Sequence, residues 1–124
     1  MLERYVQAFW DKDIEAIVSM LTEEAIWEMP PFAAWYQGAE NIGRLIDTQC
    51  PGGVRDMPMV ATWANGQPAF GLYMRAPDGG FVPFHLQVLT LEGTRVTHVA
   101  AFFGNRLFDT FGLPATLPAV DSTA

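Results

Sequence analysis

Apolar residues near the start of the chain recur with the spacing of one helical face. They follow the i, i+3, i+4, i+7, i+8 pattern, which places side chains on one side of an amphipathic helix. Asp13 is a favourable N-cap residue for a second helix, because its carboxylate can accept a hydrogen bond from a free backbone N–H. We therefore predict two consecutive short helices. The apolar residues of the first are Leu2, Tyr5, Val6, Phe9 and Trp10.

Residues 25–29 read Ala-Ile-Trp-Glu-Met, an alternation that predicts a short strand. Two prolines follow and end this strand, since proline fixes its own φ and has no backbone N–H to donate to a sheet. An aromatic loop comes next, and Gly38 leads into a third helix over residues 39–49. We expect the loop to lie at the mouth of an apolar cavity; the alternative is that its rings close one end of a filled core. The aromatic residues of the loop are Phe32, Trp35 and Tyr36.

From residue 57 onward the apolar period changes to two, which predicts strands. Asn65-Gly66 joins the first two strands and is typical of a tight hairpin turn. Helices followed by an antiparallel meander indicate an α+β fold, with the helices covering one face of a curved sheet. The predicted strands cover residues 57–64, 69–75, 81–91 and 95–103.

The end of the chain is expected to add little to the domain. One helical turn is predicted at residues 107–112, and residues 114–124 are small and predicted to form a flexible tail. We place a single domain at residues 1–113, which agrees with a length of 124 residues.

Both long strands carry apolar residues on both faces, whereas a sheet with one wet face should alternate apolar with polar. The second face therefore requires cover, and we predict that it meets a second copy of the chain or another domain. The predicted interface residues are Phe84, Leu86, Val88, Val96, Ala100 and Phe102.

Composition and charge exclude several classes of function. Fourteen acidic residues against seven basic ones give a net charge of −7, which disfavours direct binding of nucleic acid by this domain. No apolar run is long enough for a membrane span, and the N-terminus does not resemble a signal peptide. The one cysteine, Cys50, excludes an internal disulfide and favours the cytoplasm. The histidines and carboxylates show no metal-ligand spacing, so we predict no metal and no cofactor.

Several segments resemble the SnoaL-like branch of the nuclear transport factor 2-like superfamily. They read Asp-Ile-Glu-Ala-Ile-Val at 13–18, Ala-Ile-Trp-Glu-Met-Pro at 25–30 and Ala-Phe-Phe-Gly at 101–104, and the resemblance covers essentially residues 1–104. It implies a cone in which a curved, mixed or antiparallel sheet wraps round the N-terminal helices and encloses a pocket. The superfamily includes ketosteroid isomerases, polyketide cyclases and limonene epoxide hydrolases.

A narrower resemblance is to the C-terminal domain of one group of extracytoplasmic-function sigma factors. It is carried by Glu-Met-Pro-Pro at 28–31, Trp-Tyr-Gln-Gly at 35–38, Ala-Asn-Gly-Gln-Pro-Ala at 64–69 and Phe-Gly-Leu-Pro at 111–114. Those proteins carry a SnoaL-like module after domains that bind DNA and RNA polymerase. Such domains do not precede Met1 here, so the chain is either a piece of a longer protein or a stand-alone relative. The resemblance implies sigma-factor core domains or RNA polymerase as partners.

The catalytic positions of ketosteroid isomerases are largely replaced in this chain. The resemblance places the carboxylate base at Met29, which takes no proton, and the protonated acid at Gln87, an amide. Tyr5 is retained. If the chain were an enzyme, His85, Tyr5 and Gln87 would be its polar apparatus, with His85 as a general base. The favoured alternative is that His85 is a hydrogen-bonded residue that lines the cavity without catalysis.

The cone implied by the resemblance would have a mostly apolar pocket with a few polar groups, suited to a small hydrophobic ligand. The competing possibility is that these side chains fill the cone completely. The predicted pocket residues are Tyr5, Phe9, Trp27, Met29, Trp35, Phe70, Leu72, His85, Gln87, Val99, Ala101 and Phe103.

The leading hypothesis is a non-catalytic domain of a sigma-factor-type regulator, with a ligand pocket and an apolar outer sheet face for dimer or interdomain contact. The alternative is a stand-alone enzyme of isomerase, cyclase or hydrolase type that acts on a hydrophobic small molecule. A third possibility is a dimerisation module with a filled core.

Overall fold

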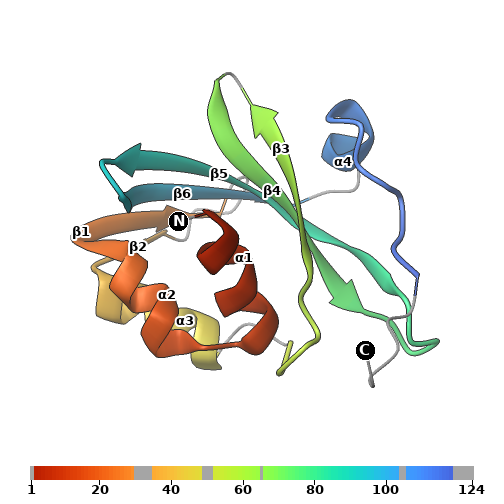
Figure 1. The fold of residues 1–124 in the computed structure, drawn as a ribbon, viewed down its shortest axis with the longest axis horizontal. Helices are drawn as coiled ribbons and strands as arrows, with labels where there is room; N and C mark the ends of the chain where they lie inside the picture. Colours follow the sequence, from red (N-terminus) through yellow and green to blue (C-terminus); the bar gives the residue numbers. More distant parts are fainter. Residues whose placement is uncertain (1, 30–34, 49–51, 65, 104–105, 119–124) are drawn as a thin grey trace.

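The computed structural model describes residues 2–29, 35–48, 52–64, 66–103 and 106–118 (Figure 1). Among the helices of these segments, none is long and apolar enough to cross a membrane. The elements in chain order are α1 (Leu2–Asp11), α2 (Ile14–Met20), β1 (Leu21–Glu28), β2 (Trp35–Gln37), α3 (Ala39–Thr48), β3 (Met59–Ala64), β4 (Gln67–Arg75), β5 (Phe81–Glu92), β6 (Arg95–Phe103) and α4 (Arg106–Thr110).

The described strands form one curved, open sheet in the order β2-β1-β6-β5-β4-β3. β1 runs parallel to β6, and the other neighbours pair antiparallel, so the sheet is mixed. The helices α1, α2 and α3 lie together on one face, while α4 lies on the other (Figure 1). The predicted α+β class, with N-terminal helices against a curved sheet, is confirmed.

Local chemistry explains where the helices begin. The Asp13 carboxylate accepts a hydrogen bond from the Ala16 N–H at 3.1 Å, which confirms the predicted N-cap of α2. Gly38 has φ of +96°, a conformation that glycine adopts without a Cβ penalty, and its carbonyl accepts from the Ile42 N–H at the start of α3.

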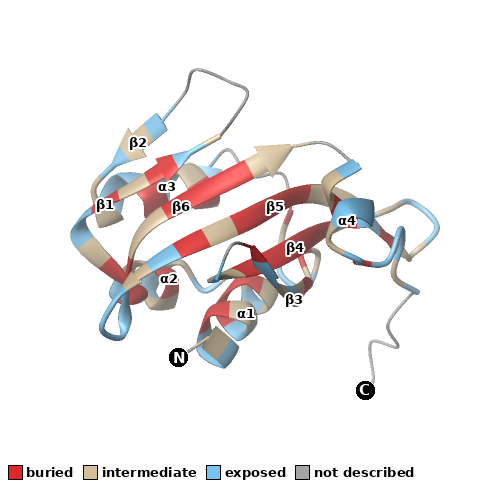
Figure 2. Cartoon of the chain, turned by 90° about the horizontal axis from the view of Figure 1, so that it is seen from above, coloured by how far each residue is buried: buried red, intermediate tan, exposed pale blue. Residues whose placement is uncertain are grey.

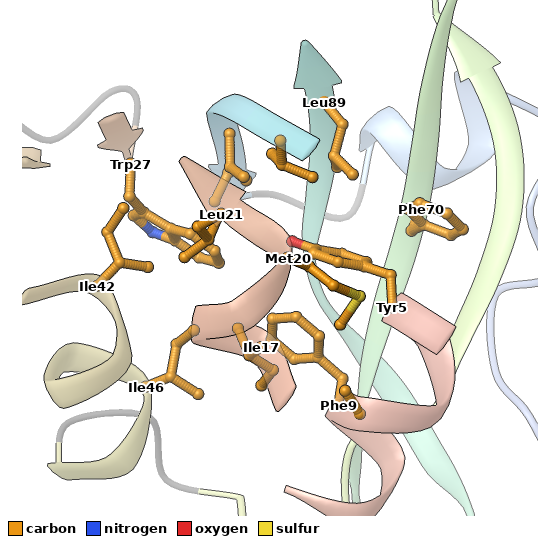
Figure 3. Packing of buried hydrophobic residues seen from close by; sticks show 14 of the residues in the cluster. Tyr5, Phe9, Ile17, Met20, Leu21, Trp27, Ile42, Ile46, Phe70 and Leu89 are labelled. Carbon is orange, nitrogen blue, oxygen red and sulfur yellow. The ribbon is translucent and has the colours of Figure 1, made fainter. Parts of the chain in front are cut away.

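The inner core fills the space between the three N-terminal helices and the sheet. Tyr5 and Phe9 project from α1, and their ring centroids lie 5.0 Å apart. Side chains of α2, α3 and the central strands close round them (Figure 3). Labelled members of this core are Ile17, Met20, Leu21, Trp27, Ile42, Ile46, Phe70 and Leu89.

Two irregularities in strand pairing move two of the predicted interface residues to the inner side. Between β4 and β5 the register jumps from Leu72↔His85 to Tyr73↔Pro83, which leaves Phe84 as an extra residue packed against the inner core. Between β5 and β6 the register jumps from Thr90↔His98 to Leu91↔Val96, which leaves Thr97 as an extra residue. Val96 is therefore fully buried in the same inner core. A β-bulge reverses the alternation beyond it, so a strict period of two predicts the wrong face.

The outer face of the sheet is covered in part by the chain itself. Figure 2 shows α4 beside β4 and β5. Phe108 of α4 and the following Leu113 are buried in one cluster with Tyr73 of β4 and with Phe81 and Leu86 of β5. Leu86 was predicted to require a partner, and α4 supplies its cover instead.

Part of the predicted flexible tail is tied to the sheet. The Tyr73 hydroxyl donates to the Pro114 carbonyl at 2.6 Å. Phe81 and Leu117 exchange two backbone hydrogen bonds, of 2.9 and 3.0 Å. Residues 119–124 lie outside the described residues, and the domain boundary at residue 113 stays a prediction.

Gly71 of β4 provides the space into which α4 packs. A Cβ at this position would lie 2.8 Å from both Leu113 Cδ1 and Phe108 Cε2. We expect Gly71→Val to lower the free energy of unfolding by about 1–3 kcal/mol, because the added atoms push α4 off the sheet. Urea unfolding measures this loss, and faster hydrogen exchange at the Leu113 N–H, which donates to Phe108, would locate it.

Ala61→Val is the matched control, because Ala61 is exposed on the neighbouring strand β3. If Gly71→Val unfolded like the wild type and the Leu113 N–H exchanged at the same rate, the close packing of α4 on β4 would be wrong.

Candidate functional site

A small cavity of about 140 Å³ lies on the inner side of the sheet. Its wall combines residues of α1, α3, β1, β5 and β6, so no single segment of the sequence forms it. The side chains that the described residues contribute to the wall are apolar apart from one imidazole and one indole N–H. The lining residues are Phe9, Trp27, Met29, Leu45, Ile46, Phe84, His85 and Phe103.

Aromatic rings surround His85 on several sides. Its ring centroid lies 5.1 Å from that of Phe84, 5.2 Å from that of Phe103 and 6.1 Å from that of Trp27. The Phe103 and Trp27 rings stand nearly perpendicular to the imidazole, at 83° and 72°. The side chain is 4% exposed, so the imidazole is held in apolar surroundings away from solvent.

A buried hydrogen-bonded chain connects Tyr5, Gln87 and His85. The Tyr5 hydroxyl donates to Gln87 Oε1 at 2.6 Å, and Gln87 Nε2 donates to His85 Nε2 at 3.0 Å. Because His85 Nε2 accepts in this arrangement, the neutral ring carries its proton on Nδ1. Tyr5 and Gln87 are fully buried, so this chain fixes the orientation of His85 from inside the core.

Burial lowers the pKa of His85 from 6.5 to about 3 and raises the pKa of the Tyr5 hydroxyl. His85 is therefore neutral at pH 7, and its ring nitrogen is a weak base. Gln87, which stands between the two titratable groups, hydrogen bonds to both but does not exchange protons with them at neutral pH. The arrangement orients a hydrogen-bonding group and is poorly suited to general acid–base catalysis, which requires a pKa near the working pH.

Two side-chain nitrogens of residues that line the cavity have no hydrogen-bond partner among the described residues. They are His85 Nδ1 and Trp27 Nε1, and both are fully enclosed. Burial of an N–H donor without an acceptor costs about 1–3 kcal/mol, so such groups need an explanation.

The structure brings together five of the twelve predicted pocket residues. Phe9, Trp27, Met29, His85 and Phe103 line the cavity, and Leu45, Ile46 and Phe84 join them. The inward helical stripe of residues 42–46 could have indicated Leu45 and Ile46, whereas no pattern indicated Phe84. Six predicted residues do not line the cavity and are buried in the core beside it: Tyr5, Phe70, Leu72, Gln87, Val99 and Ala101.

Trp35 lies away from the cavity. It belongs to β2, which pairs antiparallel with β1, where a loop was predicted. Its side chain is 59% exposed and lines a larger, open surface groove with Glu23, Glu24 and Arg44. Phe32 lies outside the described residues. We take the smaller cavity as the candidate site, because it is better enclosed and more apolar and contains the unpartnered donors.

A separate groove of about 360 Å³, called the outer groove below, lies on the outer face of the sheet between β5, β6 and α4. The predicted interface residues Leu86, Val88, Ala100 and Phe102 line it, together with Leu107 and Phe111. His98 is part of its lining, and His98 Nε2 pairs with Glu28 Oε2 at 2.5 Å. This groove lies on the outer face beside the cluster that α4 covers, and Leu86 belongs to both.

Among the described residues, no group of three His, Cys, Asp or Glu side chains is placed to hold a metal ion. Cys50 lies outside the described residues.

The lowered pKa of His85 predicts a loss of stability in mild acid. Below pH 6.5 the unfolded chain binds a proton at His85 while the folded chain does not, so the unfolded state is favoured as the pH falls toward about 3. With one pKa unit equal to about 1.4 kcal/mol, the expected loss between pH 7 and pH 5 is about 2 kcal/mol.

Urea unfolding at several pH values measures this loss. His85→Phe should reduce the slope of stability against pH, because unfolding of this variant no longer exposes a histidine at position 85 to protonation. An unchanged slope in His85→Phe would show that His85 is not buried in its neutral form.

Comparison with known proteins gives a consistent family assignment. A model of the SnoaL-like domain matches residues 2–103. The chain is 50% identical over 118 residues to "ECF RNA polymerase sigma factor SigG" of Mycobacterium tuberculosis. This match covers 94% of the chain but spans about a third of that relative, 32% of its length.

Solved structures with the same fold are distant in sequence. An NTF2-like protein of unknown function from Burkholderia xenovorans LB400 has a TM-score of 0.68 at 16% identity, covering 83% of this chain and 79% of that one. An epoxide hydrolase of the LEH-like type from Mycobacterium tuberculosis has a TM-score of 0.58 at 17% identity, covering 90% and 84%. Likeness at this identity shows the fold alone. It confirms the predicted nuclear transport factor 2-like architecture and carries no information about activity.

Proposed function

This chain belongs to the SnoaL-like domain family, and from that premise we propose that it is a non-catalytic regulatory domain of a sigma-factor-type transcription regulator. The observation that carries the proposal is the 50% identity with a sigma factor over nearly the whole of this chain. About two thirds of that relative has no counterpart here, so polymerase and promoter contacts are assigned to that remainder. The cytoplasmic location predicted from the single cysteine is part of the same proposal.

Two features of the site support a role without catalysis. The neutral imidazole of His85 is a weak base at pH 7, and the amide of Gln87 separates it from Tyr5. The resemblance to ketosteroid isomerases also implies that Met29 and Gln87 replace their two catalytic carboxyl groups. Binding and orienting a guest is what remains for this cavity.

The proposed ligand is a small hydrophobic molecule held in the cavity beside His85. A cavity of about 150 Å³ lined by aliphatic and aromatic side chains accepts a guest of the size of benzene, and the volume here is about 140 Å³. Larger ligand sites of about 300–1,000 Å³ take drug-sized molecules, so this site suits a smaller guest.

The outer groove is proposed to dock the remainder of the regulator. Its residues Val88 and Phe102 stay only half-buried after α4 has packed, and apolar side chains in such a position favour a partner. We choose an interdomain contact over a homodimer because the related sigma factor has further chain that could supply the contact. The match spans 32% of that relative, so the rest of it is about twice as long as the matched part. Sedimentation of the 124-residue chain as a concentration-independent dimer would favour the homodimer instead.

Transcription in vitro tests this function. We expect the gene to continue upstream of the Met1 codon into a basic helix-turn-helix region, and the full-length protein to direct RNA polymerase to a promoter. Removal of this domain, or Phe102→Lys in the outer groove, should change promoter-specific transcription. A start site at the Met1 codon together with no effect on transcription would contradict the proposal.

A further inference from the structure

The unpartnered donors of the cavity constrain the chemistry of its guest. Gln87 Nε2 donates to His85 Nε2, which leaves the proton of the imidazole on Nδ1. His85 Nδ1 is buried and has no acceptor among the described residues, and His85, which is 4% exposed, is one of the residues that line the cavity. The imidazole beside the cavity therefore carries a donor that lacks its acceptor.

A second donor belongs to the same wall. Trp27 Nε1 is also buried without a partner, and the indole and imidazole ring centroids are 6.1 Å apart. Among the described residues, the remaining lining side chains are hydrocarbon, except for the weak thioether acceptor of Met29. The described side chains of this wall therefore present donors and almost no acceptor.

We infer that the cavity takes a small, uncharged molecule with a hydrogen-bond acceptor oxygen, such as a ketone, ester or ether, and that His85 Nδ1–H donates to that oxygen. This inference rests on the proposed ligand-binding role and adds the class of ligand to it. Its hydrocarbon part lies among Phe9, Phe84 and Phe103, and its size is limited by the cavity of about 140 Å³.

Other guests fit this wall less well. A cation finds no carboxylate among the described lining side chains and only the weak thioether acceptor of Met29, and an anion would lose its hydration against a neutral imidazole, at a cost of several kcal/mol. A water molecule accepts from His85 Nδ1–H but brings two hydrogens that the lining side chains do not accept, whereas buried water usually makes about three hydrogen bonds. A ketone or ether oxygen satisfies the donor and brings no hydrogen of its own.

The first measurement needs no ligand. Nitrogen-15 NMR distinguishes the two neutral imidazole tautomers, and the chain has only two histidines, so His98→Gln assigns the spectrum. We expect His85 to carry its proton on Nδ1 at pH 7. A proton on Nε2 would overturn the inference, because Nδ1 would then be an acceptor.

The second measurement compares matched probes. Cyclohexanone and methylenecyclohexane have nearly the same shape, and cyclohexanone carries the acceptor oxygen. We expect cyclohexanone to bind about tenfold more tightly and to shift the His85 Nδ1–H resonance downfield, as one additional hydrogen bond would. Cyclohexylamine, which is a cation at pH 7, should not compete.

Variants locate the preference. His85→Phe should bind both probes with similar affinity, and His98→Gln, on the outer face, should keep the wild-type preference. If His85→Phe does not fold, two measurements on the wild-type chain still test the inference. They are the tautomer of His85 and the shift of its Nδ1–H resonance when each probe is added.

The outcomes separate this inference from the proposed function. Equal affinity for the two probes would overturn the acceptor chemistry and leave a hydrophobic ligand site. Binding of neither probe would overturn the inference together with the ligand part of the proposed function. A nuclear Overhauser effect between water and His85 Nδ1–H that persists in the presence of cyclohexanone would show that this donor binds only water. That result would also overturn the inference.

Discussion

Phe9→Ala is expected to lower the free energy of unfolding by about 3–5 kcal/mol, the usual range for removal of a fully buried phenylalanine. Phe9 is 1% exposed, and its ring packs between Tyr5, at 5.0 Å between centroids, and Trp27, at 6.5 Å. The loss is expected at the high end, because these aromatic neighbours lie on different elements and cannot collapse into the space together. Urea unfolding at pH 7 measures the change.

The same substitution should enlarge the candidate site, since Phe9 forms part of its wall. We expect Phe9→Ala to bind a larger ring, such as acetophenone, more tightly than the wild type does, and to regain stability in its presence. Trp63→Ala is the matched control: Trp63 is 63% exposed on β3, so its removal should change stability by about 0.5 kcal/mol or less. Similar losses in both variants would contradict the position of Phe9 in the core.

Gln87→Leu is expected to cost about 2–5 kcal/mol, although leucine is apolar and similar in size. Gln87 is fully buried and bonds to both Tyr5 and His85. Its loss leaves the Tyr5 hydroxyl and His85 Nε2 without partners, and each such group costs about 1–3 kcal/mol. Thermal or urea unfolding gives the magnitude.

A rescue experiment distinguishes lost hydrogen bonds from poor packing. Adding Tyr5→Phe and His85→Phe to Gln87→Leu removes the two unpartnered groups, so the triple variant should be more stable than Gln87→Leu alone. Gln7→Leu is the matched control, because Gln7 is exposed and bonds only to Asp11 on the same helix. If Gln87→Leu were as stable as the wild type, the buried chain from Tyr5 to His85 would not exist in solution.

The order and type of most elements follow from local patterns. The helical spacing from Leu2 to Trp10, the Asp13 cap and the proline stop after residue 29 act over a few residues, so they can be recognised without knowing the fold. The hairpin between β3 and β4 is similar: Ala64 pairs with Gln67, and Gly66 has φ of +79°. The short strand β2 was missed because its three residues pair with β1 and show no period of their own.

The face on which a strand residue lies depends on the neighbouring strands as well. Phe84 and Val96 have the parity of the outer face, yet both lie inside, because bulges opposite Tyr73 and Leu91 shift the alternation. The position of a bulge depends on how neighbouring strands pair and on which side chains must pack against the helices. The sequence of one strand alone does not contain this information. The cover of Leu86 by α4 is likewise a long-range contact.

By itself the sequence determined the helical and strand periods, the family resemblance and the apolar character of both sheet faces. These features are patterns of residues close together in the chain, so they can be read without knowledge of the fold. Only the tertiary structure decided that the predicted pocket contracts to a small cavity and that His85 lines it with an unpartnered Nδ1. The physical reason is that a cavity is the space left after distant side chains have packed, and a tautomer is set by partners such as Gln87 and Tyr5 that only the fold brings together.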